Sequence, residues 1–597
     1  MKILLAACNA KYIHSNLAVY NLKSCSGKYS PNVVIKEYTI NQIRDDILKD
    51  IYLEQPDVIC FSCYIWNISF VKELVPDLKK ILPHVDFWAG GPEVSYDAVE
   101  FLKKNPAFFG VMVGEGEETF HELAGYYIER KPENLKEIRG VAFHDETKVP
   151  DIVHTGWREL MDLSKVPFAY SNLTEFKNRI IYYESSRGCP FSCSYCLSSI
   201  DKKLRFRDIE LVKNELQFFI DNKVPQVKFV DRTFNCKHDH AMAIWRYITE
   251  HDNGITNFHF EISADLLREE ELALMKTMRP GLIQLEIGVQ STNPQTIKAI
   301  RRTMDFEKLK GIVEQIHGFG NIHQHLDLIA GLPYEGYDSF HKSFCDVYAL
   351  RPEQFQLGFL KVLKGSHMME MTREYQILYK DREPYEVLST AWLTYGEILR
   401  LKMVESMVEV YYNSGQFKHT LVFLEQYFED PFRMYEALGR FYEKKGYSEI
   451  SHSRMRRYEI LMEFAGEQKE IPLEVLSDVM LLDLYLRENL KSRPSFASDQ
   501  KPYERMIWDY RKAEKIPKTA HIEVFRDGKK ILFDYTDRDP LTNNARLTDI
   551  TDEVNKNYGN VLSEKKKSDH SDHRSYSGSC NGSSDCTFAD HLLRRQL

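Results

Sequence analysis

Residues 184–199 read Glu184-Ser-Ser-Arg-Gly-Cys189-Pro-Phe-Ser-Cys193-Ser-Tyr-Cys196-Leu-Ser-Ser199, and this stretch decides the fold. Three of the eleven cysteines lie here with the spacing C-x3-C-x2-C. Thiolates are the ligands that iron–sulfur clusters prefer. Three thiolates from one short loop can hold three corners of a cube-shaped [4Fe–4S] cluster, which leaves the fourth iron open to another ligand.

Two other interpretations of this cysteine triad remain, a structural zinc site and three incidental buried cysteines. A structural zinc ion needs a fourth protein ligand, and no second C-x2-C pair follows at the spacing of a zinc ribbon. Three cysteines clustered this tightly by chance would be improbable. The triad therefore favours an iron–sulfur cluster.

Residues 179–365, which contain the triad, alternate apolar strand candidates with amphipathic helical stretches. Such alternating units predict a partial or complete parallel barrel whose site lies at the C-terminal ends of the strands. The cysteines follow the first strand at that end, and Asp231, Glu261, Glu286, Gln290 and Gly331 lie at the ends of later strands. The strand candidates are Ile180–Glu184, Val227–Asp231, Phe258–Ile262, Leu282–Gly288, His323–Ala330 and Phe355–Leu360.

Residues 1–126 show a similar alternation and predict a separate α/β domain. Strands rich in β-branched residues between helices indicate a parallel sheet covered on both faces, with ligands beyond the carboxyl ends of its strands. The strand candidates are Lys2–Ala7, Val33–Ile40, Val58–Cys63, Val85–Ala89 and Phe109–Val113.

Three turns at the carboxyl ends of these strands suit a ligand. The third strand runs into Ser62, the fourth into Gly90-Gly91-Pro92-Glu93, and the fifth into Gly114-Glu115-Gly116-Glu117. Glycine lets a backbone come close to a large molecule. Any one of them alone is more simply an ordinary tight turn, but three on one edge favour a binding site.

The rest of the chain differs in character. Residues 127–178 form a predicted connector with a small hairpin at 140–149. Residues 366–555 have helical apolar spacing and predict a mostly helical domain, with a hairpin near 521–535 around Asp527-Gly528. Residues 556–597 are rich in Ser, His, Asp, Gly and Lys, so we expect a disordered tail.

Size, charge and cysteine usage exclude several classes of protein. A chain of 597 residues is expected to form two to four domains. The net charge of −9 and the lack of a long basic stretch argue against nucleic-acid binding. No run of eighteen apolar residues occurs, so we expect no membrane span. An odd number of mostly scattered cysteines favours a reducing, cytoplasmic location.

The triad, with the aromatic Tyr195 just before its third cysteine, resembles the signature of the radical S-adenosylmethionine (SAM) superfamily. The resemblance implies a partial TIM barrel in which Cys189, Cys193 and Cys196 hold a catalytic [4Fe–4S] cluster. It implies that SAM chelates the open iron and is cleaved by one electron to a 5′-deoxyadenosyl radical. The electron would come from a low-potential donor such as flavodoxin or ferredoxin.

The same resemblance implies positions for the SAM contacts. Tyr195 and Gly331 would lie near the adenine, and Asp231 near the methionyl amine. Glu261, Glu286 and Gln290 would hold the ribose and the carboxylate. The chain departs from the family pattern because no Gly-Gly-Glu follows the second barrel strand, which puts the amine contact in doubt.

The N-terminal domain resembles the cobalamin-binding class of these proteins through Gly91-Pro92-Glu93 and Gly114-Glu115-Gly116-Glu117. The pattern Asp-x-His-x-x-Gly, which supplies a lower histidine ligand to cobalt in many cobalamin domains, is absent. His14 is the only histidine near the corresponding loop, so we expect cobalamin without a histidine lower ligand. The expected cobalamin contacts are Ser62, Gly90, Gly91, Pro92, Gly114, Glu115 and Glu117.

The helical region resembles an uncharacterised C-terminal domain of the DUF4080 type. Together these resemblances imply methyl transfer to an unidentified small-molecule or peptide substrate. A cobalamin-dependent radical cyclase or rearrangement enzyme is the alternative, and a cobalamin- or redox-sensing binding protein is a third hypothesis. A nucleic-acid methylthiotransferase fits less well, because the N-terminal cysteines form no second triad and the chain is acidic.

Overall fold

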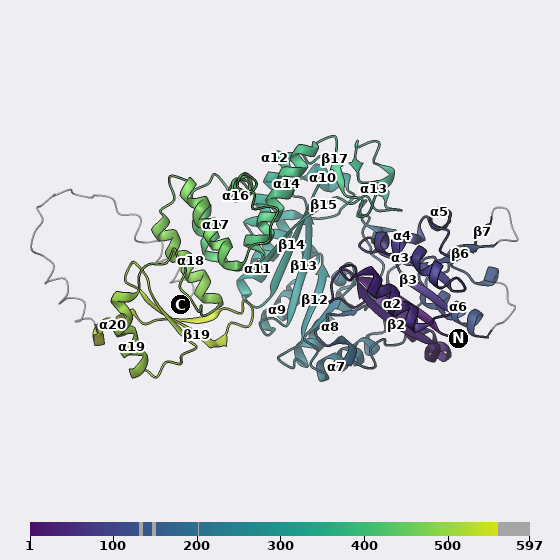
Figure 1. Cartoon of the computed structure of the whole chain (residues 1–597), viewed down its shortest axis with the longest axis horizontal. Coiled ribbons are helices and arrows are strands. Elements are labelled where there is room, and N and C mark those ends of the chain that lie inside the picture. Colours follow the sequence, from purple (N-terminus) through teal and green to yellow (C-terminus); the bar gives the residue numbers. More distant parts are fainter. Residues whose placement is uncertain (130–134, 146–150, 201, 559–597) are drawn as a thin grey trace, which may run out of the picture. The chain divides into compact units, whose positions relative to one another are not determined.

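The computed structural model describes residues 1–129, 135–145, 151–200 and 202–558 (Figure 1). These residues divide into two compact units. The first holds Met1–Pro352 and Leu357–Ile398, and the second holds Glu353–Gln356 and the residues from Leu399 onward. Most of the tail expected to be disordered lies outside the described residues, and its first residues end helix α20 (Thr551–Tyr558).

The first unit begins with a seven-stranded sheet in the order β2-β1-β3-β4-β5-β6-β7. Its first five strands are parallel, as the sequence predicted, and β6 and β7 add to it antiparallel. The strands are β1 (Ile3–Asn9), β2 (Val33–Thr39), β3 (Val58–Ser62), β4 (Asp86–Gly90), β5 (Gly110–Met112), β6 (Val141–His144) and β7 (Ile152–His154).

Helices cover this sheet because their apolar residues recur at helical spacing. Helix α3 buries Val71, Leu74 and Leu78 on one face. Every residue of β1 is buried, which is the pattern of a strand covered on both sides. The main helices of this part are α1 (Leu17–Cys25), α2 (Arg44–Glu54), α3 (Ile68–Ile81), α4 (Pro92–Ser95), α5 (Ala98–Lys104) and α6 (Glu117–Glu129).

The hairpin expected in the connector has a larger role than the sequence suggested. Strand β6 pairs with the edge strand β5, and its apolar residues Val141, Ala142 and Phe143 are buried. The hairpin therefore extends the N-terminal sheet and is not a free linker. The predicted turn between its strands, residues 146–150, lies outside the described residues.

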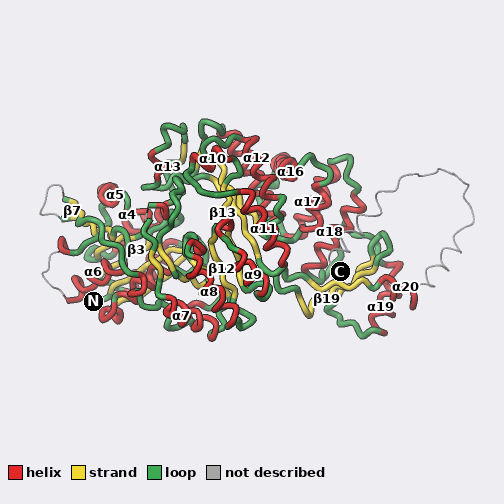
Figure 2. The backbone as a smooth tube through the Cα atoms, turned by 180° about the vertical axis from the view of Figure 1, so that it is seen from behind, coloured by secondary structure: helices red, strands yellow, loops and turns green. Residues whose placement is uncertain are grey.

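The second sheet of this unit has six strands in the order β15-β14-β13-β12-β11-β8, and every strand predicted for the barrel is present. Figure 2 shows β12 and β13 running side by side. The pairs from β8 through β14 are parallel, and the described strands do not close into a ring, so the barrel is partial. The strands are β8 (Ile181–Tyr183), β11 (Gln226–Phe229), β12 (Asn257–Ile262), β13 (Ile283–Gln290), β14 (His323–Ala330) and β15 (Gln354–Phe359).

Helices connect the barrel strands, as in other βα folds. They are α7 (Ile209–Asp221), α8 (His238–Glu250), α9 (Glu269–Thr277), α10 (Pro294–Ala299), α11 (Phe306–Phe319) and α12 (Tyr337–Tyr348).

A loop of the N-terminal sheet lies against the open edge of the barrel. The loop after β1 forms a parallel bridge in which His14 faces Ile180, and the amide of Ile180 donates to the carbonyl of Ile13 at 2.8 Å. The hydroxyl of Ser15 donates to the carbonyl of Ile180 at 2.8 Å. The two sheets are therefore joined beside β8 by backbone contacts.

The segment 366–398 belongs to the first unit, whereas the sequence placed the start of the helical domain at 366. It holds α13 (His367–Glu370), β16 (Leu378–Tyr379) and β17 (Val387–Ser389). The hydroxyl of Tyr385 donates to Glu93 Oε1 at 2.5 Å, and Lys72 pairs with Glu383 at 2.8 Å. These contacts with the N-terminal sheet explain why the segment packs with the first unit.

The second unit is mostly helical, as predicted. Its helices are α14 (Tyr395–Met407), which begins in the first unit, α15 (Lys418–Glu425), α16 (Pro431–Lys445), α17 (Arg454–Glu467), α18 (Leu473–Arg487), α19 (Glu504–Ala513) and α20. A three-stranded antiparallel sheet follows, with β18 (His521–Val524), β19 (Lys530–Arg538) and β20 (Ala545–Asp549). The Asp527-Gly528 hairpin joins β18 and β19, and the third strand was not expected from the sequence.

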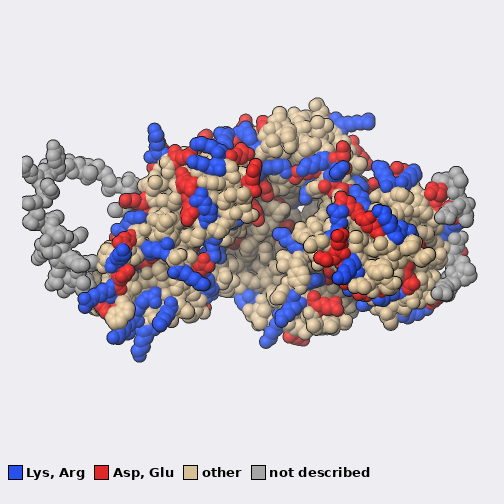
Figure 3. Space-filling model, in the orientation of Figure 1, with Lys and Arg blue, Asp and Glu red and all other residues tan. Residues whose placement is uncertain are grey.

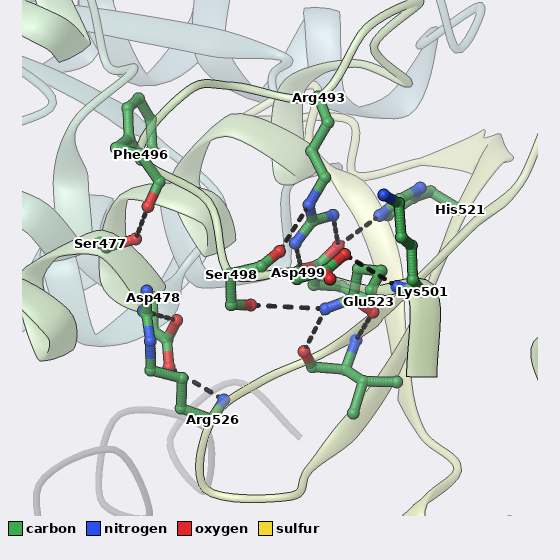
Figure 4. Close-up of polar contacts among 12 residues, drawn as sticks. Ser477, Asp478, Arg493, Phe496, Ser498, Asp499, Lys501, His521, Glu523 and Arg526 are labelled. Atoms are coloured by element: carbon green, nitrogen blue, oxygen red, sulfur yellow. Dashed lines mark hydrogen bonds and ion pairs between the residues drawn. The ribbon is translucent and has the colours of Figure 1, made fainter. Parts of the chain in front are cut away.

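A buried carboxylate fixes the loop before this sheet (Figure 4). Glu523 on β18 is fully buried, and the guanidinium of Arg493 donates to both of its oxygens, at 2.9 and 2.5 Å. His521 lies 2.9 Å from the same carboxylate. A buried charge is tolerated when it is paired in this way.

The visible surface carries charges of both signs. Figure 3 shows Lys and Arg side chains interspersed with Asp and Glu over the visible face, so the described residues form no extended basic surface there. Among the described helices, none is both long and apolar enough to cross a membrane.

Candidate functional site

The three cysteines of the triad line one cavity in the barrel, which has a volume of about 840 Å³ including the open space at its mouth. Cys189 and Cys193 are buried, and Cys196 is half-buried. The loop that carries them is anchored at its middle, because the carbonyl of Ser194 accepts a hydrogen bond from the amide of Met368 at 2.7 Å. The loop therefore presents all three thiols to one space.

The base of the cysteine loop is held by Asp231. Asp231 is fully buried and is not among the residues that line the cavity, and its contact with the methionyl amine stays a prediction. It accepts hydrogen bonds from the amide and hydroxyl of Ser185, at 2.9 and 2.6 Å, and from the hydroxyl of Ser186 at 2.5 Å. Burial raises the pKa of Asp231 to about 6.

Four residues expected to contact SAM do lie on the cavity wall with the cysteines, namely Tyr195, Glu261, Glu286 and Gln290. Gln290 is buried with a left-handed backbone (φ 71°), and its Oε1 has no hydrogen-bond partner among the described residues. A buried acceptor without a partner is costly. Gln290 therefore fits a ligand that donates hydrogen bonds, as the amine and hydroxyl groups of SAM do.

Arg302, which the sequence did not single out, lies beside the triad. Its guanidinium is 3.7 Å from the sulfur of Cys193 and 3.5 Å from the hydroxyl of Tyr195, and it also donates to the carbonyl of Gly288. Burial raises the pKa of Cys193, and the charge of Arg302 opposes that rise. Because metal ligands must be thiolates, Arg302 favours the form of Cys193 that binds iron.

Two further charged residues of the cavity wall were not predicted, Arg232 and Asp327. Burial raises the pKa of Glu261 to about 7, and the nearby charge of Arg232 opposes that rise. Arg232 directly follows Asp231, the predicted strand end. A charged residue one position beyond that end was the signal in the sequence that could have pointed to Arg232. Asp327 sits inside a predicted strand, where an acidic residue in an apolar run was a signal too.

Gly331 is not among the residues that line the cavity, and its place near the adenine stays a prediction. Its backbone has φ 89°, and an added Cβ would lie 2.8 Å from a methyl carbon of Val387. The glycine is needed where the segment 366–398 packs against the end of β14.

The predicted cobalamin residues lie together at one edge of the N-terminal sheet. Ser62 ends β3, Gly90 ends the adjacent β4, and Gly114 follows β5. Gly91 has φ 112°, and an added Cβ would come within 2.5 Å of the carbonyl oxygen of Cys63. The backbone at this edge therefore requires glycine, and Pro92 begins the short helix α4 directly after it.

Two of the predicted cobalamin residues, Glu115 and Glu117, are engaged in ion pairs. The guanidinium of Arg187 lies 3.1 Å from Glu115 and 2.8 Å from Glu117. Arg205 lies 2.6 Å from Glu115. Because Arg187 belongs to the cysteine stretch, these carboxylates join the N-terminal sheet to the base of the cysteine loop.

His14 is also engaged. Its Nδ1 lies 2.7 Å from the hydroxyl of Tyr182 on β8, and burial lowers the pKa of the imidazole. The ring is therefore held toward the barrel by a hydrogen bond.

Comparisons with known protein families agree with this architecture. Residues 3–124 match the B12 binding domain, and residues 183–344 match the radical SAM superfamily. The fold and the cysteine site thus define a B12-binding radical SAM protein, with the domains that bind cobalamin, SAM and a [4Fe–4S] cluster. Residues 373–557 match a protein of unknown function, DUF4080, so the chain matches a B12-binding radical SAM protein with a DUF4080 C-terminal domain, domain by domain.

Individual relatives are distant. A 2-(S-pantetheinyl)-carbapenam-3-carboxylate methyltransferase of Streptantibioticus cattleyicolor is 26% identical over 307 residues, which cover 48% of this chain and 44% of that protein. An anaerobic magnesium-protoporphyrin IX monomethyl ester cyclase of Synechocystis is 25% identical over 38% of this chain and 46% of the relative. The chain thus matches less than half the length of either protein.

Two solved structures share the fold. The radical SAM methyltransferase TsrM of Kitasatospora setae, solved with cobalamin and a [4Fe–4S] cluster, gives a TM-score of 0.54 at 16% identity, over 65% of this chain and 82% of TsrM. The cobalamin-dependent SAM radical enzyme OxsB gives 0.55 at 14% identity, over 86% of this chain and 75% of OxsB.

Proposed function

We propose that this protein is a cobalamin-dependent radical SAM methyltransferase. The observation that carries the proposal is the cavity in which the cysteine triad, Arg302 and the unpartnered Gln290 meet, and the N-terminal sheet adds an edge that requires glycine. When bound, the [4Fe–4S] cluster supplies the electron that cleaves SAM, and cobalamin supplies the methyl group. Methyltransferases among the relatives support this choice.

The roles of the residues follow from their places. Cys189, Cys193 and Cys196 hold the cluster, and the charge of Arg302 opposes the rise in the pKa of Cys193 that burial causes. Gln290 accepts a hydrogen bond from SAM. Glycines at the edge of the N-terminal sheet leave room for the corrin ring close to the backbone.

We propose that cobalamin binds without a histidine lower ligand from this chain. The proposed cobalamin contacts are Ser62, Gly90, Gly91, Pro92, Gly114, Glu115 and Glu117. Support comes from His14, whose imidazole is held by Tyr182, and from the absence of the Asp-x-His-x-x-Gly pattern. Replacing His14 with alanine should leave the visible spectrum of bound cobalamin unchanged, because the histidine does not ligate cobalt.

The substrate is proposed to be a small molecule or a peptide, and the reductant a flavodoxin or ferredoxin. The first test needs neither the substrate nor the protein reductant. Anaerobic reconstitution should restore the cluster in the wild type, and SAM with a chemical reductant should then yield 5′-deoxyadenosine. Cys193→Ala should abolish that product, because a cluster with two cysteine ligands is not retained. Undiminished cleavage by the variant would refute the assigned cluster site.

A radical cyclase or rearrangement enzyme is the second candidate, favoured by the cyclase among the relatives. The two reactions differ in the fate of the SAM methyl group. Protein loaded with reduced cobalamin and methyl-labelled SAM should form labelled methylcobalamin and S-adenosylhomocysteine if it is a methyltransferase. Formation of 5′-deoxyadenosine without any label on cobalamin would favour the cyclase.

A further inference from the structure

Three side chains inside the barrel form a cluster separate from the cysteines. Glu286 on β13 is the direct register partner of His325 on β14. Asp327 lies two residues after His325 and so shares its face of the strand. One oxygen or nitrogen atom from each of these three residues lies within 4.8 Å of the others.

The close pair in this cluster brings an imidazole nitrogen next to a carboxylate oxygen. The Nε2 of His325 and the Oδ1 of Asp327 are 3.0 Å apart. Within the part of the chain that the structure describes, neither atom has a partner that meets hydrogen-bond geometry. His325 is only 6% exposed, so water does not readily replace the missing partner. A nitrogen and an oxygen donor this close together, with a third donor atom within 4.8 Å, can bind one ion jointly.

Neighbouring side chains hold Glu286 in an orientation that suits a metal ligand. The Oε2 of Glu286 accepts a hydrogen bond from Lys228 at 2.9 Å and lies 3.0 Å from the Nε2 of His259. Outer contacts of this kind fix a metal-binding carboxylate. Because a carboxylate has two oxygens, Lys228 leaves the other oxygen of Glu286 available.

The cluster is reachable from the cavity that the cysteines line. Glu286 and Asp327 both belong to the wall of that cavity. An ion held by one imidazole and two carboxylates would therefore have coordination positions open to the cavity. One nitrogen and two oxygen ligands suit Mn²⁺, Fe²⁺ or Zn²⁺, and two carboxylates balance the charge of such an ion.

We propose that Glu286, His325 and Asp327 bind one divalent transition-metal ion, distinct from the iron–sulfur cluster, whose open positions take an oxygen donor of a molecule in the cavity. In this arrangement Glu286 binds the metal ion, whereas the sequence predicted that it contacts SAM. The rival arrangement is a metal-free pair between a protonated His325 and Asp327. The inference stands whether or not the protein is a methyltransferase.

Mn²⁺ is a suitable probe, because free Mn²⁺ gives a strong paramagnetic resonance signal in solution that is lost on binding. The full-length protein with its cluster reconstituted would be treated with a chelator, desalted and titrated with Mn²⁺ without air. About one Mn²⁺ bound per chain is the expected result. Failure of the wild type to bind Mn²⁺ at millimolar concentration would overturn the proposal and favour the metal-free pair.

Three variants locate the ion. Asp327→Asn keeps the size of the side chain and His325→Ala removes the imidazole, and each should weaken Mn²⁺ binding at least about tenfold. His323→Ala is the matched control, because His323 lies on the same face of β14 but outside the cluster. It should bind Mn²⁺ like the wild type. Equal binding by all four proteins, or loss in His323→Ala as well, would show that the ion sits elsewhere and refute the assignment.

Folding and cluster content would be checked in each variant by circular dichroism and by iron and sulfide analysis. Because these readouts report the cysteine site independently, loss of Mn²⁺ with a full cluster separates this inference from the proposed function.

Discussion

Arg302 shows how a single residue can prepare the cysteine site. Its guanidinium lies beside the sulfur of Cys193 and opposes the effect of burial on that thiol. Arg302→Gln removes the charge, so the pKa of Cys193 should rise and cluster assembly should shift to higher pH. Iron and sulfide per chain, measured after reconstitution at several pH values, would reveal this shift.

The adjacent Arg301 is exposed, so Arg301→Gln is the matched control and should assemble its cluster like the wild type. Identical pH profiles for the two variants would contradict the role given to Arg302.

Asp231 makes a prediction about stability and pH. Its pKa in the fold is about 6, above the ordinary value of 3.8. The folded state therefore binds the proton more tightly, and this contribution to stability is lost as pH rises from about 4 to 6. Between pH 5 and 7 the loss is about 1–1.5 kcal/mol.

Asp231→Asn lacks the titrating group, so its thermal unfolding temperature should improve relative to the wild type as pH rises from 5 to 7. The comparison uses cluster-free protein, so that iron loss does not enter. A constant difference between the two proteins across this range would show that Asp231 is not protonated in the fold.

At the scale of the element, the turn after β4 strictly limits which residue type can occupy its first position. Gly91 has φ 112° and packs its α-carbon against the carbonyl of Cys63. Gly91→Ala should destabilise this turn by about 1–3 kcal/mol, and should weaken cobalamin binding, measured by titration with hydroxocobalamin in the visible spectrum.

The neighbouring Gly90 lies in regular strand backbone, and an added Cβ there would meet Met112 no closer than 3.4 Å. Gly90→Ala should therefore preserve the fold far better than Gly91→Ala. If both variants bind cobalamin and melt as the wild type does, the turn does not approach the corrin ring.

Most elements of the first unit could be predicted because their local patterns are strong. Short buried runs such as Val58–Phe61 on β3, bounded by polar residues, favour strands covered on both faces, and the apolar spacing of α3 favours a helix. The partners of polar residues could not be predicted. Glu115 forms an ion pair with Arg187, which comes from a distant part of the chain, and Gly331 packs against Val387. Strand-end carboxylates such as Asp231 and Glu261 look alike in sequence, yet only the second reaches the cavity.

At the scale of the whole first unit, Arg187 connects the two sheets. It pairs with Glu115, Glu117 and Glu184, all of them largely buried. Arg187→Met would leave three carboxylates without their shared cation, which should cost about 3–5 kcal/mol. Thermal unfolding and cluster content of the full chain should both fall.

An exposed ion pair provides the comparison. Lys103 and Glu100 are both more than half exposed, and Lys103→Met should change stability by less than about 1 kcal/mol. Similar melting of the two variants would mean that Arg187 does not join the sheets in solution.

The loop that bridges His14 to Ile180 has a consequence for how the chain is made. A ribosome completes the N-terminal sheet before strand β8 emerges, so the partner for the open edge of the barrel already exists when that edge first appears. Unpaired strand edges invite aggregation. A chain cut to begin at residue 179 would lack this partner, and its barrel should be prone to self-association during synthesis.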